Sequence, residues 1–346
     1  MKIAIDCRMI RCSGIGTFIQ GVLPHIIQSD SNEILLVGDI RDLECYWKEN
    51  VSFQDCTIPI FSLKELFRFP VERINQCDVF FSPNYNLPLG VKIPIVSTIH
   101  DVIFLDVDNL CSDFGKLIRH GFLKYAISKS DRIITPSEFS KSRIKFHFST
   151  TKPITVCYNG LSEKVKEFTA QNCPNTPKDE YIVFVGNIKK HKGLETLVSA
   201  YNLAKKRGLR KKLFIVGNKD NFKTAADFNM SLENESIVFT GYLDDESLLS
   251  AIHNASALIQ PSLYEGFGIP PLEAMALGTP AIISDIPVFK EIYEDYPVSF
   301  FHAGDVNDLA NALLMDLQKI NLDKSLIEKY TYQQTAQTII KELQSV

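Results

Sequence analysis

Short runs of apolar, β-branched residues alternate with longer amphipathic segments along almost the whole chain of 346 residues. The first half holds the runs KIAID, EILLVG, DVFFSP, IPIVSTIH, RIITPS and ITVCYNG, and the second half YIVFVG, KKLFIVG, SIVFTG, ASALIQPS and PAIISD. These runs are continuous, as is typical of strands covered on both faces of a parallel sheet. Segments with helical spacing, such as LETLVSAYNLAKKRG, lie between them. The pattern predicts α/β units joined by right-handed crossovers.

The alternation breaks once, in the polar, proline-containing stretch SEKVKEFTAQNCPNTPKDE, where we expect an interdomain linker. Because a chain of this length is too long for one core, we predict two Rossmann-like halves facing each other across a cleft. Their expected bounds are 1–165 and 181–325, with the linker at 166–180 and a final helix at 326–346. Ligands of such sheets bind beyond the carboxyl ends of the strands, so the loops there are the places to search.

Charge, hydropathy and cysteine content argue against several classes of protein. The net charge of -4 gives no electrostatic reason to expect nucleic acid as a partner. The run MKIAIDCRMI is typical of a strand and has no apolar h-region, so we expect no signal peptide. No apolar run reaches the roughly 18 to 20 residues of a membrane-spanning helix. Eight cysteines without a CxxC pair suggest reduced cytosolic thiols, because a chain of this size is not a typical disulfide scaffold. No zinc site is expected.

Three residues in the first half, in two loops, are candidates for ligand contact. Gly14 and Gly16, after the first predicted strand, indicate either a backbone that approaches an anionic ligand closely or ordinary turn residues. A dinucleotide fingerprint is incomplete, because its third glycine falls at Ile19. His100 ends the run IPIVSTIH, so it lies at the mouth of the expected cleft or is tied to a backbone carbonyl. We interpret the DVD segment at 106–108 as a chance match to a metal-binding DxD pair and predict no metal site.

Two motifs in the second half carry more chemistry. In VGNIKKHKGLETL, a cluster containing Lys189 and Lys192 precedes a helix, where cations are favourable only beside a bound anion; the alternative is a solvated basic turn. In YEGFGIPPLEAM, a glycine-containing turn leads into a helix near 271–277. Glu265 and Glu273 could each accept hydrogen bonds from a polyol, with a diphosphate between, which describes a nucleotide sugar. Glu273 could equally be a carboxylate that stabilises the start of its helix.

The segment EGFGIPPLE resembles the E-x7-E motif of retaining GT-B glycosyltransferases, and QPSLYEGFGIPPLEAMALGTPAIISDIPVFKEI resembles glycosyltransferase family 4 throughout. IAIDCRM and SGIGTF resemble the N-terminal loop of bacterial mannosyltransferase-type members, and VGNIKKHKG resembles their phosphate-binding turn. The resemblance implies a metal-independent hexosyltransferase without a cofactor, with a final helix that crosses back to the first domain. Many members have an arginine where this chain has Asn187, so Lys189 is expected to supply that charge.

The resemblance also implies roles for individual residues. Glu265 would bind the transferred sugar, Glu273 the ribose, and Lys192 the diphosphate, while His100 would reach the donor sugar. The implied catalytic set is His100, Glu265 and Lys192. The implied donor-binding set is Gly14, Gly16, Asn187, Lys189, Lys192, Glu265, Gly266, Phe267, Gly268 and Glu273. GDP-mannose is the first choice of donor, and UDP-sugars come next.

The acceptor is expected on the first domain. The tract KLIRHGFLKYAISKSDR carries Lys116, Arg119 and Lys124 together with apolar positions at helical spacing. It could bind anionic lipid at the inner face of the cell membrane or be a solvated helix face. We therefore expect a cytoplasmic enzyme of bacterial surface polysaccharide synthesis that uses a saccharide or lipid-linked acceptor. The alternatives are a GT-B-fold epimerase that acts on UDP-N-acetylglucosamine and a non-catalytic nucleotide-sugar sensor.

Overall fold

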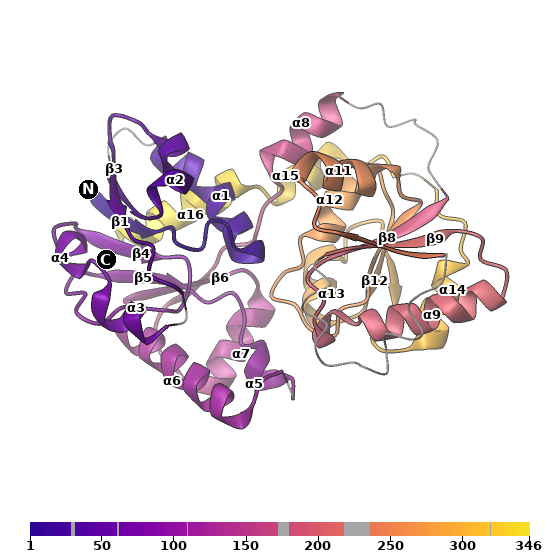
Figure 1. The fold of residues 1–346 in the computed structure, drawn as a ribbon, viewed down its shortest axis with the longest axis horizontal. Coiled ribbons are helices and arrows are strands. Elements are labelled where there is room, and N and C mark those ends of the chain that lie inside the picture. The colour runs from indigo at the N-terminus through magenta and orange to yellow at the C-terminus, as the bar shows by residue number, and fades with distance from the viewer. Residues whose placement is uncertain (29–31, 61, 109, 172–179, 218–235, 319) are drawn as a thin grey trace. The chain divides into compact units, whose positions relative to one another are not determined.

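A computed structural model of the chain describes residues 1–346 except 29–31, 61, 109, 172–179, 218–235 and 319. Two compact domains are present (Figure 1), the first formed by Met1–Gly160 with Tyr330–Val346 and the second by Leu161–Lys329. Each is built on a parallel sheet with helices around it, so the prediction of two Rossmann-like domains is confirmed. None of the helices in the described ranges is long and apolar enough to cross a membrane.

The sheet of the first domain has the strand order β3-β2-β1-β4-β5-β6-β7, and all its pairings are parallel. Its central strands are apolar and buried on both faces. The strands are β1 (Lys2–Asp6), β2 (Glu33–Gly38), β3 (Val51–Asp55), β4 (Val79–Ser82), β5 (Ile95–Thr98), β6 (Arg132–Thr135) and β7 (Ile154–Val156). The helices are α1 (Ser13–Ile27), α2 (Ile40–Leu43), η1 (Glu44–Tyr46), α3 (Leu63–Arg68), α4 (Val71–Ile74), α5 (Ile103–Asp106), α6 (Asp113–Lys129), α7 (Glu138–Phe148) and α16 (Tyr332–Gln344).

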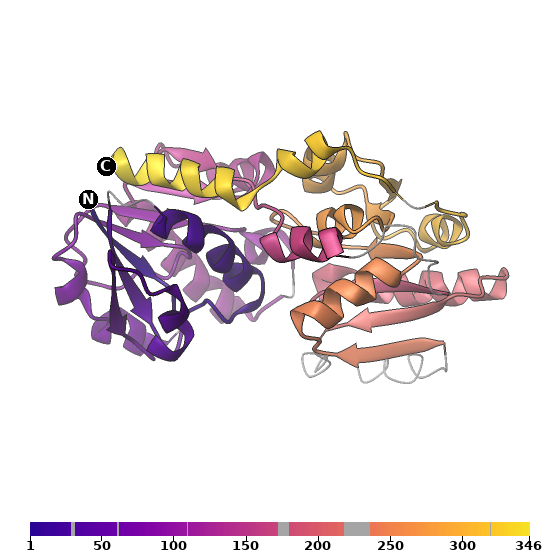
Figure 2. The ribbon, with the colours of Figure 1, turned by 90° about the horizontal axis from the view of Figure 1, so that it is seen from above.

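Helix α16, which ends the chain, packs on α1 in the first domain (Figures 1 and 2). Tyr332 is buried in the core of this domain, and a Cβ atom at Gly21 would lie 2.4 Å from its ring. At Gly160 a Cβ would lie 2.1 Å from the Tyr332 backbone nitrogen. Thr335 Oγ1 donates a hydrogen bond of 2.6 Å to the carbonyl of Tyr158. The predicted return of the C-terminal helix to the first domain is thus confirmed.

The sheet of the second domain has the strand order β10-β9-β8-β11-β12-β13, again parallel. Its strands are β8 (Tyr181–Val185), β9 (Lys212–Val216), β10 (Ile237–Gly241), β11 (Ala257–Gln260), β12 (Ala281–Ser284) and β13 (Ser299–Phe301). Its helices are α8 (Glu163–Gln171), η2 (Lys190–Lys192), α9 (Leu194–Lys206), α11 (Asp245–Asn254), α12 (Pro270–Ala276), α13 (Pro287–Tyr293), α14 (Val306–Leu313) and α15 (Lys324–Lys329).

The structure corrects two sequence-based expectations. Residues 161–165, predicted in the first domain, belong to the second, and 166–171, predicted as linker, belong to α8, which packs on α11 and α12 there. Val165 supplies its buried contact. Of the rest of the predicted linker, 172–179 lie outside the described residues, and Glu180 directly precedes β8. The segment 326–346 is not one helix, because α15 ends at Lys329 in the second domain and α16 begins at Tyr332 in the first.

Candidate functional site

The strand order of the second domain reverses between β8 and β11, which are hydrogen-bonded neighbours. In doubly wound sheets, ligands bind beyond the carboxyl ends of the strands at such a switch point. The loop after β8 leads through the basic turn to α9, and the loop after β11 leads through the E-x7-E segment to α12. The switch point therefore brings together the two motifs that the sequence singled out.

At this switch point Lys192 and Glu265 form an ion pair. Lys192 Nζ lies 2.6 Å from Glu265 Oε1 and 2.9 Å from Oε2. The carboxylate also accepts hydrogen bonds from Ser262 Oγ at 2.7 Å and from Gln260 Nε2 at 3.3 Å. The Glu265 side chain is only 10% exposed, and a buried charge of this kind requires such partners. Sequence analysis missed Ser262 and Gln260, whose signal was polar residues at the end of a buried strand.

Main-chain contacts join the two loops. The backbone nitrogen of Leu263 donates a 2.7 Å hydrogen bond to the carbonyl of His191. Gly193, which follows Lys192, has φ +69°, and a Cβ there would lie 1.9 Å from the carbonyl oxygen of Pro261. Only glycine permits both this backbone conformation and this close approach. Gly193 therefore allows the basic turn to lie against the strand end that leads to Glu265.

The electrostatics of the pair differ from those of its histidine neighbour. Burial raises the pKa of Glu265, but the Lys192 ammonium and the Ser262 hydroxyl outweigh this effect and bring the pKa below its ordinary value. Burial, aided by Lys192, lowers the pKa of His191 to about 4. Glu265 is therefore ionised and His191 neutral at physiological pH. The Nδ1 atom of His191 is buried and has no hydrogen-bond partner among the described residues.

Backbone geometry in the E-x7-E loop leaves amide groups available to a ligand. Gly268 has φ +86°, and a Cβ there would lie 2.4 Å from the Phe289 ring. The N–H groups of Gly268 and Ile269 donate no hydrogen bond to any described residue. The following residues, Pro270 and Pro271, have no N–H group. Main-chain donors for a ligand are therefore concentrated in the loop before α12.

Glu273 lies in the first turn of α12, at the expected place. It is half-buried, and burial together with the charge of Asp245 raises its pKa to about 7. Both carboxylates of the motif thus belong to one compact domain but have opposite pKa shifts. Such divergence is common where a fold assigns different roles to two similar groups.

The remaining donor-site candidates of this domain occupy the same two loops. Asn187 and Gly266 are half-buried, and Phe267 is buried. Lys189, in contrast, is exposed, and no ion pair to it is found among the described residues. Its predicted role as a substitute for the family arginine stays a prediction.

The first sheet has its own switch point, between β1 and β4. Gly14 and Gly16 lie in the first turns of α1, after the loop that follows β1. A Cβ at Gly14 would meet nothing within 4 Å, so this side of the backbone is open. A Cβ at Gly16 would lie 2.6 Å from the carbonyl oxygen of Ile10. Gly16 is therefore required by the packing of its own loop, whatever it also does for a ligand.

His100 follows β5, and its ring is held by a backbone carbonyl, one of the two arrangements expected for it. Its Nε2 lies 2.9 Å from the carbonyl oxygen of Pro83, and its ring meets that of Phe18 edge-on at 5.1 Å. Burial lowers its pKa, so the imidazole is neutral at physiological pH. With Nε2–H donating to Pro83, Nδ1 remains an acceptor and bonds to none of the described residues.

The two aspartates of the DVD segment at 106–108 form ion pairs within the first domain. Asp106 accepts a 2.9 Å hydrogen bond from Arg143 Nε, and its carboxylate lies 2.7 Å from His147 Nε2. These contacts connect α5 to α7. Asp108 is exposed, 3.8 Å from the ammonium of Lys116. Within the part of the chain that the structure describes, no group of three or more potential metal ligands is found.

The three basic residues proposed to face a membrane or acceptor lie on α6, with Arg119 and Lys124 exposed and Lys116 half-buried. Large apolar side chains are exposed beside them: Phe114 (72%), Leu117 (68%) and Ile118 (43%) on α6, and Phe146 (69%) on α7. Spacings of three and four residues place the α6 members on one helix face. The rings of His120 and Phe148 stack at 5.0 Å and connect α6 to α7.

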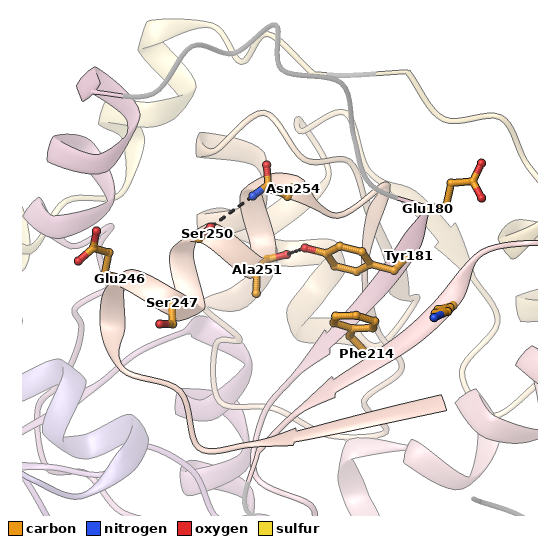
Figure 3. A pocket seen from close by; sticks show the side chains of 9 residues that line it. Glu180, Tyr181, Phe214, Glu246, Ser247, Ser250, Ala251 and Asn254 are labelled. Atoms are coloured by element: carbon orange, nitrogen blue, oxygen red, sulfur yellow. Dashed lines mark hydrogen bonds between the residues drawn. The ribbon is translucent and has the colours of Figure 1, made fainter. Parts of the chain in front are cut away.

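An open groove of about 730 Å³ lies elsewhere on the second domain (Figure 3). Its lining includes the rings of Tyr181 and Phe214, stacked at 4.2 Å, and Ser247 and Asn254 of α11. Tyr181 begins β8, so the groove lies toward the amino ends of the strands. The switch-point loops are at the opposite ends, and we therefore separate this groove from the candidate site.

Two protein-family models match successive parts of the chain. The model described as Glycosyltransferase Family 4 matches residues 57–164, and the model described as Glycosyl transferases group 1 matches residues 165–332. Together they extend over most of both domains. The second match contains the basic turn, the ion pair and the whole E-x7-E segment.

Individual proteins show the same likeness. An uncharacterized glycosyltransferase of Methanocaldococcus jannaschii is 30% identical over 218 residues, which is 60% of this chain and 55% of that protein. The O-antigen chain mannosyltransferase RfbU of Salmonella typhimurium is 30% identical over 179 residues, 49% of this chain and 46% of RfbU. The matches thus span about half of these relatives. Anabaena HepE, solved with UDP-glucose, shares the fold, with a TM-score of 0.72, 16% identity and 100% coverage of both chains.

Proposed function

We propose, because the chain belongs to the family 4 glycosyltransferases of GT-B fold, that it transfers a hexose from a nucleotide sugar with retention at the anomeric carbon. The observation that carries this proposal is the Lys192–Glu265 pair, held at the switch point beside the open amides of the E-x7-E loop. Glu273, one turn into α12, completes a set of groups suited to a sugar, a diphosphate and a ribose.

The ion pair retains hydrogen-bonding capacity for both proposed roles. A lysine ammonium has three N–H donors. Two of these donate to the two carboxylate oxygens of Glu265, which leaves one for a ligand. Among the described residues, Glu265 Oε1 accepts from Lys192, Ser262 and Gln260, whereas Oε2 accepts from Lys192 alone. Lys192 can therefore bind a diphosphate oxygen, and Oε2 a sugar hydroxyl, while the pair stays intact.

In the proposed reaction, the bond from the anomeric carbon to the diphosphate oxygen breaks, and a bond to the acceptor oxygen forms on the same face. The acceptor proton passes to the leaving diphosphate. Lys192 and the loop amides stabilise the charge that develops there, so no metal is required. His100, neutral and with Nδ1 available, accepts a hydrogen bond from a hydroxyl group of the donor sugar. We nominate no carboxylate nucleophile, and a glycosyl-enzyme adduct detected by mass spectrometry would overturn this route.

We propose GDP-mannose as the donor, because RfbU is named a mannosyltransferase; UDP-sugars are next. The acceptor is a saccharide or lipid-linked saccharide in bacterial surface polysaccharide synthesis. The exposed apolar and basic side chains of α6 and α7 support peripheral contact with an anionic membrane. Sedimentation with anionic liposomes at low salt tests this contact, and Leu117→Glu should abolish it while leaving donor binding unchanged.

Thermal-shift titration with GDP, UDP, dTDP and their sugars tests the donor. A bound donor raises the melting temperature by mass action, and Glu273→Ala should reduce that rise. Donor hydrolysis without acceptor separates an enzyme from a sensor, and formation of an epimerised sugar would identify the epimerase alternative. If millimolar concentrations of all these nucleotides give no shift, the proposed function is wrong.

A further inference from the structure

The E-x7-E loop is supported from behind by helix α13. The hydroxyl of Tyr293 donates a hydrogen bond to the carbonyl oxygen of Gly268, and the ring of Phe289 lies 2.4 Å from the position that a Cβ of that glycine would take. Both aromatic side chains are fully buried, and their rings meet at 5.8 Å. Two residues one helical turn apart therefore fix a single peptide unit of the candidate site.

Fixing the Gly268 carbonyl also fixes the next amide. A peptide bond is planar and trans, so its N–H points away from its C=O. With the carbonyl of Gly268 bound to Tyr293, the N–H of Ile269 points away from α13. That N–H has no acceptor among the described residues, and the two residues that follow are prolines. The Tyr293 hydroxyl thus determines the direction of the last free amide before α12.

We propose that Tyr293 is a positioning residue for the donor: through the Gly268 carbonyl, its hydroxyl aims the Ile269 amide at the nucleotide sugar. This inference rests on the proposed function, because the loop must be the place where donor binds. Tyr293 touches neither donor nor acceptor in this role. Its effect is to lower the freedom of the loop before the donor arrives, which strengthens binding by preorganisation.

The alternative is that Tyr293 merely fills the core, and the chain offers a matched control for it. Tyr296 is also buried, its ring meets that of Tyr293 at 5.6 Å, and its hydroxyl donates to the carbonyl of Leu326 at 2.8 Å. Leu326 lies in α15, outside the switch-point loops. Tyr293→Phe and Tyr296→Phe each remove one oxygen atom and one hydrogen bond to a backbone carbonyl, so their structural costs are matched.

The first measurement is hydrogen exchange in peptides that cover 264–269, which needs no knowledge of the ligand. Tyr293→Phe should increase exchange there about fivefold, the factor that the loss of one net hydrogen bond produces. Tyr296→Phe should leave 264–269 unchanged and increase exchange in 324–329. Phe289→Leu, which loosens the packing on Gly268, should act in the same direction as Tyr293→Phe and serves if that variant is poorly folded.

The second measurement is calorimetric titration of each variant with GDP-mannose and UDP-glucose. The dissociation constant of whichever sugar binds should rise about fivefold in Tyr293→Phe and less than twofold in Tyr296→Phe. Equal affinity in Tyr293→Phe and wild type, or equal losses in both variants, would overturn the positioning role and leave the proposed function standing. If wild type binds neither sugar, nor any nucleotide in the thermal-shift set, the proposed function fails and this inference fails with it.

Discussion

Replacement of Glu273 by glutamine should stabilise the second domain in a pH-dependent manner. Burial and Asp245 raise the pKa of Glu273 to about 7, whereas an unfolded chain releases this proton near 4.5. As pH rises from 4.5 to 7 the unfolded state loses the proton first, so stability falls. The shift corresponds to about 3 kcal/mol at pH 8, an upper value because the carboxylate keeps some exposure. Glu273→Gln removes that cost.

Scanning calorimetry should show the second domain of Glu273→Gln melting roughly 6–12 °C higher at pH 8 and unchanged at pH 4. Glu273→Gln should weaken donor binding although it stabilises the domain, because an ionised carboxylate offers one oxygen to each ribose hydroxyl whereas a glutamine amide has a single acceptor oxygen. Wild-type affinity should therefore rise between pH 6 and 8, and the rise should be absent in Glu273→Gln. The exposed Glu294→Gln is the control. A lower melting point at pH 8, or a wild-type affinity that is flat with pH, would refute the reasoning.

Lys192→Met should lower the unfolding free energy by about 3–5 kcal/mol, because it leaves the Glu265 carboxylate buried without its cation. Substitution of the exposed Lys189 by Met should change this free energy by less than about 0.5 kcal/mol. Urea titration measures both values, and equal values would contradict the ion pair. Gly21→Ala should cost about 1–3 kcal/mol, because its Cβ would overlap the ring on α16. Gly121→Ala, with nothing within 4 Å of its Cβ, should instead stabilise α6 by roughly 0.5–1 kcal/mol, and a loss there would contradict this reading of α6.

Sequence pattern predicted the central strands of both sheets because burial on two faces demands continuous apolar runs. It missed β3 and β13, which lie at sheet edges. VSFQD mixes polar with apolar residues, and SFF has only three residues, so neither forms the continuous apolar run that identified the others. Helix α8 was interpreted as linker because its sequence is mostly polar and its packing depends on few apolar positions. In each case tertiary position, which local sequence does not encode, decided the outcome.

At the candidate site, the sequence predicted which residues belong to the site better than it predicted which of them contact one another. Lys192 and Glu265 were both singled out, with separate ligands in mind, but their ion pair joins residues 73 positions apart. Gln260 and Ser262 were not predicted as site residues, because polar residues at the end of a strand are common and mark no particular site. Gly193 was passed over because its necessity arises from the Pro261 carbonyl, on a different loop. Partnerships of this kind follow from the strand order, which no single motif contains.

The strand order also explains why the chain can hold an ionised and a protonatable carboxylate so close in sequence. Glu265 lies in the loop after the switch-point strand β11, where the loop after β8 supplies the Lys192 cation and keeps the carboxylate charged. Glu273 lies on the helix that follows, where burial dominates and its charged neighbour is another carboxylate. A cation lowers and a like charge raises the pKa of a carboxyl group. The turn that leads into α12 thus places the two carboxylates of one motif in different electrostatic environments, and the pH dependence argued for Glu273 should be absent from Glu265.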